Sequence, residues 1–120
     1  MPEENDNEII VTNEPISALR LFEFAAGQFG DMVKAVVDTH RRMAAIGGEL
    51  HSDEEAALLE RGSRQEHLWG INIYVEKPRS EWIQFDSLIN VRPRHGNRSR
   101  NVEDAAVRQL IQEIMDALIQ

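Results

Sequence analysis

The chain has 120 residues, of which 42% are hydrophobic and 28% charged, and a formal net charge of -8. This length suits one domain, and the apolar fraction suffices for a folded core, which excludes a disordered chain. The absence of Cys excludes disulfides and thiolate metal sites. The acidic balance argues against bulk nucleic-acid binding. The apolar runs are too short to span a membrane, so we expect a cytoplasmic protein without a leader or a membrane span.

The N-terminal part of the chain predicts a tail, a strand and a helix. Residues 1–7 are polar and hold acids but no base, so we expect a disordered acidic tail before a single α+β domain over 8–120. The β-rich run 8–12 predicts a first strand. After Pro15, which is tolerated in a first helical turn, apolar residues recur at spacings of three and four over 16–26 and predict a helix.

Two apolar runs, 31–38 and 43–46, then follow each other closely. Their short separation predicts an antiparallel β-hairpin. One continuous helix over 32–46 is the alternative, because several of these residues would also share a helical face. We favour the hairpin, since β-branched residues cluster in the first run and Gly47-Gly48 closes the second.

A helix is expected from Ser52 to Glu60. Ser52 and Glu55 have the spacing of a capping box, in which each side chain bonds the backbone N–H of the other residue. Gly62 then follows as a left-handed residue beyond the C-terminal end.

The C-terminal half predicts a second hairpin and a last helix. Runs 68–76 and 81–91 alternate apolar and polar residues, so the hairpin should have one core face and one polar face. Asn101 suits the N-cap of an amphipathic helix over 102–119. The order β-α-β-β-α-β-β-α predicts an α+β fold. We expect a mostly antiparallel or mixed sheet of about five strands, with three helices packed on one face and the final helix among them.

The strongest candidate site is the basic loop, residues 92–101, which has four arginines and no acid. It leads into a helix start, where free amides and the helix dipole favour anions, and Gly96 can help form a concave nest of amides. The residues that would bind a phosphate or carboxylate are Asn97, Arg98, Ser99 and Arg100. In the alternative reading, these arginines are solvated or pair with acids such as Glu103 and Asp104.

The polar face of the second hairpin is another candidate. Asp86, Asn90 and Arg92 share that face, and Asn72 and Tyr74 should point the same way across the hairpin. If the basic loop folds back over this face, its arginines join the same pocket. The alternative is an ordinary solvent-facing side of an antiparallel sheet.

An acidic segment offers side chains that ligate divalent cations: Asp38, His40, Glu49, His51 and Asp53. Their spacing matches no recognised metal motif, and Asp53 is explained by its place at the positive end of a helix dipole. We therefore expect no metal site and no cofactor.

Four segments together resemble a family of small bacterial and archaeal proteins classified as a domain of unknown function. These segments are residues 28–38, 47–55 (GGELHSDEE), 68–74 (LWGINIY) and 96–99 (GNRS). The resemblance covers most of the chain from Pro15 onward. It implies no activity and carries over no catalytic residue.

From these patterns we expect a binding domain for a small anionic ligand or for the acidic part of a partner. The basic loop would hold the anion, and Asp86, Asn90 and Arg92 would line the approach. Nucleic acid and membranes are not the expected partners.

Two other functions stay open. The first is an enzyme in which Asp86 or His51 acts as acid or base and an arginine such as Arg98 stabilises negative charge. The second is a structural module that forms a homodimer through Trp82, Leu88 or an open sheet edge.

Overall fold

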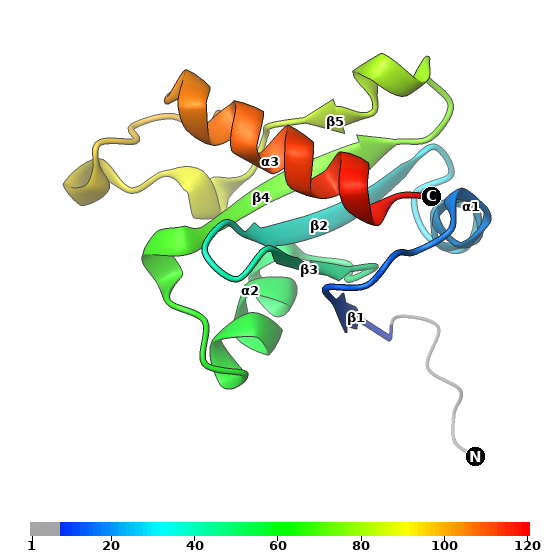
Figure 1. Ribbon diagram of the computed structural model, residues 1–120, viewed down its shortest axis with the longest axis horizontal. Coiled ribbons are helices and arrows are strands. Elements are labelled where there is room, and N and C mark those ends of the chain that lie inside the picture. The colour runs from blue at the N-terminus through cyan, green and yellow to red at the C-terminus, as the bar shows by residue number, and fades with distance from the viewer. Residues whose placement is uncertain (1–7) are drawn as a thin grey trace.

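The computed structural model describes residues 8–120, and the predicted tail, 1–7, lies outside them. The sheet has the strand order β1-β3-β2-β4-β5, and its strand pairs are antiparallel. The strands are β1 (Ile10–Thr12), β2 (Met32–Asp38), β3 (Met43–Ile46), β4 (Leu68–Tyr74) and β5 (Ile83–Gln84). The α-helices are α1 (Ala18–Gly27), α2 (His51–Glu60) and α3 (Ala105–Leu118). The α+β class and the five-stranded sheet with a final helix packed on it are confirmed (Figure 1).

The two faces of the sheet carry different helices, with α3 in front of the sheet and α2 behind it in Figure 1. On the α1 and α3 face, Val33, Ala35 and Val37 of β2 enter the larger core cluster. On the opposite face, Leu58 of α2 packs with Val36 of β2. The prediction that the helices pack on one face is therefore wrong. The central strand β2 has buried residues on both sides, including Val36 on the side of α2, so both faces of the sheet need cover.

The hairpin of β2 and β3 is confirmed, and the alternative of one helix over 32–46 is excluded. The fully buried Asp38 closes its turn. Its carboxylate accepts hydrogen bonds from the backbone N–H groups of His40 and Arg41, both at 2.9 Å. It also accepts one from the Ser63 hydroxyl at 2.6 Å. The extended form prevails because alternate residues of β2 are buried on opposite faces of the sheet.

Helix α2 begins at His51, just before the predicted start, and its N-cap residue gives no side-chain hydrogen bond. The predicted capping box of Ser52 and Glu55 is wrong. Glu54 reaches back instead, and its Oε2 accepts a hydrogen bond of 2.8 Å from the backbone N–H of Gly48. The earlier start turns Glu54 toward the sheet, where it is fully buried.

Helix α3 begins at Ala105, later than predicted, and its N-cap is Asp104, which accepts a 2.8 Å hydrogen bond from the N–H of Ala106. Asn101, the predicted cap, belongs to the preceding loop, because the side chain of Asn97 donates to its carbonyl at 2.7 Å. The predicted apolar stripe holds, with buried Ile111, Ile114, Met115 and Leu118. None of the helices within residues 8–120 is long and apolar enough to cross a membrane.

The second hairpin is much shorter than predicted, because only Ile83 and Gln84 of the run 81–91 form a strand. Beyond them the chain leaves the ladder, and the side chain of Asn90 takes the place of a strand beside β4. Its Oδ1 accepts from the Gly70 N–H at 2.8 Å, and its Nδ2 donates to the Gly70 carbonyl at 3.0 Å. A Cβ on Gly70 would lie 2.5 Å from the Cβ of Ser87, so glycine allows this close approach.

Candidate functional site

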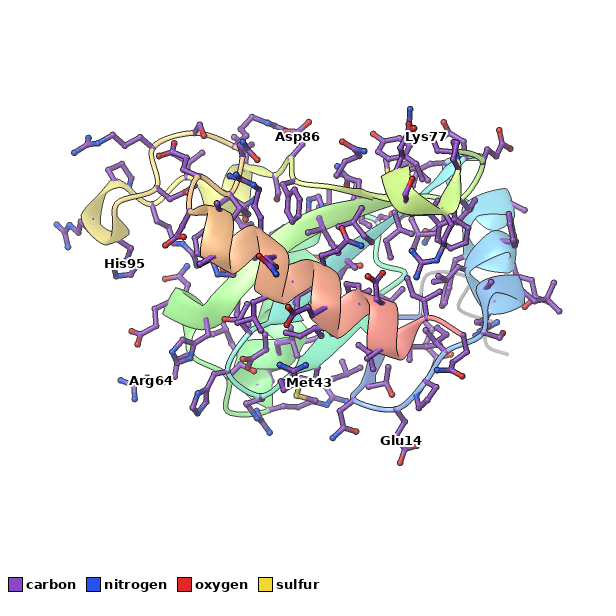
Figure 2. All side chains as sticks on the ribbon, turned by 45° about the horizontal axis from the view of Figure 1, so that its top comes forward. Glu14, Met43, Arg64, Lys77, Asp86 and His95 are labelled. Carbon is purple, nitrogen blue, oxygen red and sulfur yellow. The ribbon has the colours of Figure 1, made fainter. Side chains whose placement is uncertain are left out.

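The basic loop, residues 92–101, lies at one end of the molecule, and Figure 2 shows His95 near its tip. Asn97, which is 4% exposed, organises the loop from inside. Its Oδ1 accepts a 2.8 Å hydrogen bond from the N–H of Glu103. Its Nδ2 donates to three backbone carbonyls, at 2.7, 3.0 and 2.7 Å: those of Asn90, Ser99 and Asn101. A buried amide bonded in this way shapes the loop and has no group left for a ligand.

The backbone amides of the basic loop hold a carboxylate of the same chain. The N–H of Arg98 donates to Oε2 of Glu103 at 3.0 Å. A hydrogen bond from the Ser99 hydroxyl is the main cause that lowers the pKa of Glu103, and the backbone N–H groups of Arg98 and Ser99 act in the same direction. The amides predicted to hold an external anion therefore bind Glu103.

Two of the other predicted residues form a surface ion pair. Nε of Arg100 lies 2.6 Å from Oδ1 of Asp86, with both side chains more than half exposed. Asp86 thus pairs with Arg100 and not with Arg98, whose exposed guanidinium makes no hydrogen bond to the described part of the chain. Asn90 is fully buried and is used by the backbone of Gly70 and by the Arg100 carbonyl.

Arg92 is the most buried arginine of the loop, with 9% exposure, and its backbone pairs with that of Asn97. Its guanidinium carbon lies 4.3 Å from the ring centroid of Trp69, and its Nη1 donates to the Gln65 carbonyl. Its Nε and Nη2 are buried and have no hydrogen-bond partner within residues 8–120. Burial lowers the pKa of Arg92, and the charge of Glu55 opposes this.

A shallow cleft opens beside this arginine. Its volume is about 400 Å³, and its lining residues are Gln65, Arg92, Pro93, Arg94 and His95. We call it the Arg92 cleft. Three of its five lining residues carry or can carry positive charge, so its chemistry suits an anion.

A second polar group lies on the face of the sheet that α2 covers. We call it the His51 cluster, and it consists of Lys34, His51, Glu54 and Asn72. His51 is 7% exposed, and its Nε2 lies 2.8 Å from the Ile71 carbonyl oxygen. A carbonyl only accepts, so Nε2 carries the hydrogen and donates it. In the neutral ring, Nδ1 is therefore left as an acceptor.

Charged groups from β2 and from two loops act on His51. Burial is the main cause that lowers the pKa of His51, and the positive charges of Lys34 and Arg100 act in the same direction. The hydrogen bond to Ile71 and the charge of Asp86 oppose them. The lowered pKa favours the neutral form of the ring, the form that can accept a hydrogen bond at Nδ1.

Glu54 is fully buried one helical turn after His51. Its Oε2 is bonded to the Gly48 N–H, while its Oε1 has no hydrogen-bond partner within the described residues. Burial raises the pKa of Glu54 well above its ordinary value, and the Gly48 N–H and the charge of Lys34 only partly offset this. The site thus favours the protonated acid.

On the sheet side of the cluster, a row of neighbouring side chains crosses the strands β2, β4 and β5. Lys34 stands opposite Asn72, and Asn72 stands opposite Gln84, so the three point to one face of the sheet. Asn72 is 5% exposed and its Nδ2 donates to the Asp86 carbonyl at 3.1 Å, but its Oδ1 has no partner in residues 8–120. A cleft of about 390 Å³ continues this row, lined by Tyr74, Lys77, Gln84, Phe85 and Asp86.

The acidic segment does not converge on a metal site. Asp38 and His40 close the turn between β2 and β3, whereas His51 and Asp53 lie at the start of α2. Across residues 8–120, no three His, Asp or Glu side chains come close enough together to hold a metal ion.

The residues named for a homodimer also differ in exposure. Trp82 is 6% exposed, meets the Phe22 ring edge-on and donates from Nε1 to the Lys77 carbonyl, so it is part of the core. Leu88 is 69% exposed. A dimer contact through Leu88 stays a prediction.

Sequence reasoning missed the convergence of Lys34 with His51 and Glu54. One signal was present: Lys34 interrupts the apolar run 32–37, which is unusual in a buried strand. A second was the spacing of three between His51 and Glu54, which places them on one helical face only if the helix starts before Ser52.

Comparison with known proteins identifies one family. The family model described as a protein of unknown function (DUF5674) matches residues 9–118. No curated protein and no solved structure gives a significant match. Since the match spans nearly the whole chain, the predicted resemblance to a family of unknown function is confirmed. The chain belongs to the DUF5674 family of proteins of unknown function.

Proposed function

We propose that this domain binds an oxyanion, either a small ligand or an acidic side chain of a partner, through the basic loop and chiefly at the Arg92 cleft. The observation that carries the proposal is the buried guanidinium of Arg92, which has no ion-pair partner in the described structure. No acidic side chain among the described residues forms a salt bridge with it. Two of its donor nitrogens are buried without a partner.

A buried cation is unfavourable unless a counter-charge and hydrogen bonds offset its loss of hydration. The guanidinium lies over the Trp69 ring in a cation–π contact, which offsets part of that loss. A carboxylate or phosphate at the cleft would supply the missing negative charge. Arg94 and His95, which line the same cleft, add further donors.

The rest of the loop would contribute in different ways. Arg98 is exposed and extends the positive surface of the loop. Ser99 and Arg100 already have partners in Glu103 and Asp86, so an anion would compete for them. Asn90 and Asn97 would act by keeping the loop in shape and not by contacting the ligand.

Isothermal titration calorimetry at low ionic strength tests the proposal, with inorganic phosphate and a short glutamate peptide as separate probes. Whichever probe binds, Arg92→Met should weaken it at least about tenfold, the equivalent of about 1.4 kcal/mol. Arg79→Met is a matched control, because Arg79 also stacks on a tryptophan, at 4.9 Å from Trp82, but is paired with Asp116 at 3.3 Å.

The control should bind the probe as the wild type does. Binding of either probe should also weaken as salt is added, because exposed charges are screened. The proposal fails if neither probe binds, or if Arg92→Met and Arg79→Met bind equally well.

A further inference from the structure

The His51 cluster lies outside the basic loop and contains polar atoms that the fold itself does not use. Glu54 Oε1 and Asn72 Oδ1 are buried oxygens without a partner in the described structure. Buried polar atoms are nearly always hydrogen-bonded, so unused ones need an explanation. Because both residues are at least nine-tenths buried, they are also held in place by their surroundings.

The same cluster contains a third acceptor. The bond from His51 Nε2 to the Ile71 carbonyl leaves Nδ1 as the bare nitrogen of the neutral ring. Nδ1 and Asn72 Oδ1 both require a donor, such as a hydroxyl group. Glu54 Oε1 can either accept a hydrogen, when ionised, or donate one, when protonated.

Two cationic side chains, Lys34 and Arg100, lie near these acceptors, as do the carboxylates of Asp53 and Asp86. Lys34 stands opposite Asn72, and its charge acts on both His51 and Glu54. Its Nζ lies 5.5 Å from the centroid of the Phe29 ring and makes no hydrogen bond within residues 8–120. Arg100 binds Asp86 through Nε, and its two terminal nitrogens make no other bond in the described chain.

Space for a ligand lies next to this group. The cleft of about 390 Å³ begins at Asp86 and Gln84, and Gln84 stands opposite Asn72 on the same face. Lys77 lines the cleft as well. Its volume falls within the range of small-molecule sites.

We infer that the His51 cluster and the adjoining cleft form a second binding site, for a small hydroxylated anion such as a hydroxy acid or a polyol phosphate. Lys34 and Arg100 bind the anionic group. His51 Nδ1 and Asn72 Oδ1 accept hydrogen bonds from the hydroxyl groups. This site uses side chains of α2, β2 and β4 together with Arg100 of the basic loop, and does not depend on the Arg92 cleft.

Nuclear magnetic resonance of the histidine rings tests this site, because each of the two sites has its own histidine. Glycerol 3-phosphate and tartrate are the probes. The comparison compounds are inorganic phosphate, which lacks the polyol hydroxyl groups, and glycerol, which lacks the anionic group. We expect at least one of the two probes to shift the His51 ring and the Asn72 side-chain amide, with tighter binding than either comparison. A ligand of the Arg92 cleft would instead shift the ring of His95.

Variants locate the binding energy. Lys34→Gln and His51→Gln should each weaken the effective probe at least about tenfold, since each loses a direct contact to it. The glutamine at 51 keeps an N–H donor for the Ile71 carbonyl but lacks the ring nitrogen. Arg79→Gln is the control for Lys34→Gln, because it also replaces one cationic side chain by glutamine, and the side chain of Arg79 contacts Asp116 and Trp82 and not the cluster.

Circular dichroism checks that each variant is folded. If His51→Gln does not fold, Lys34→Gln still tests the site, because Lys34 is only half-buried. The inference is overturned if neither probe shifts His51, or if only His95 responds. It is also overturned if the comparisons bind as tightly as the probes, or if Lys34→Gln binds like Arg79→Gln.

Discussion

Replacing Asn90 with alanine is expected to remove the side chain that completes the sheet beside Gly70. Asn90 is fully buried and makes three hydrogen bonds: with the N–H and the carbonyl of Gly70, and with the carbonyl of Arg100. At about 1 kcal/mol net for each bond, the loss is about 3 kcal/mol. Both backbone groups of Gly70 would also be left unpaired in the interior, so the loss should lie at or above that value.

Urea unfolding measures this change, and hydrogen exchange at the Gly70 amide locates it. We expect the alanine variant to lose at least about 3 kcal/mol of unfolding free energy and the Gly70 amide to exchange faster. Asn101→Ala is the control, because Asn101 is exposed and its side chain makes one local bond, of 2.8 Å, to the N–H of Val102. It should lose no more than about 1 kcal/mol.

A second variant separates the two halves of the amide. Asn90→Asp keeps an acceptor for the Gly70 N–H but places a second oxygen against the carbonyls of Gly70 and Arg100. It should therefore be at least as unstable as the alanine variant at neutral pH. The reasoning is refuted if Asn90→Ala costs less than about 1 kcal/mol while the Gly70 amide stays protected.

Three further predictions concern the His51 cluster and the glycines. The folded-state pKa of Glu54 is raised above its unfolded value, so the stability that its protonation contributes is complete below about 4.5 and is lost as pH rises through the folded pKa. Glu54→Gln should remove this loss of stability, as measured by urea unfolding across pH. A variant whose stability depends on pH as the wild type's does would contradict the assignment to Glu54. The folded-state pKa of His51 is lowered, so its contribution is complete above about 6.5 and is lost as pH falls through the folded pKa. His51→Gln should flatten the stability curve on that acid side, and a steeper curve would contradict the assignment. Gly47→Ala should cost about 3 kcal/mol or more, since φ is +95° and a Cβ would lie 2.5 Å from the Phe24 ring. Gly96→Ala, with φ of +84° but open space, should cost only about 1 kcal/mol, and equal losses in thermal unfolding would refute the role of the Phe24 contact.

The sequence was informative where one local pattern decided the structure. The Val-rich run of β2 and the apolar stripe of α3 predicted their elements correctly, because burial on the sheet agrees with local periodicity there. The sequence was misleading where a side chain, that of Asn90, makes the hydrogen bonds that a neighbouring strand would make with β4. Nothing in the alternating pattern of 81–91 indicates that Asn90 would bond Gly70 in place of a strand.

For the candidate site, too, the local pattern was predictable and the long-range contacts were not. The charge of the basic loop was visible in the sequence, but the partners of its residues depend on contacts between distant segments. Asp86 meets Arg100 across 14 positions, and Glu103 occupies the amides beside Arg98. The capping-box pattern predicted that α2 starts at Ser52, but the helix starts one residue earlier, at His51, and this start turns Glu54 inward.

Glu103 gives the basic loop a tethered ligand of its own. Because this carboxylate is joined to the loop by only a few residues, its effective concentration at the amides of Arg98 and Ser99 is on the order of millimolar or higher. An acetate-like group from solution would bind there only by displacing it. The loop is therefore protected from weak, abundant carboxylates, and only an anion that uses additional contacts can compete.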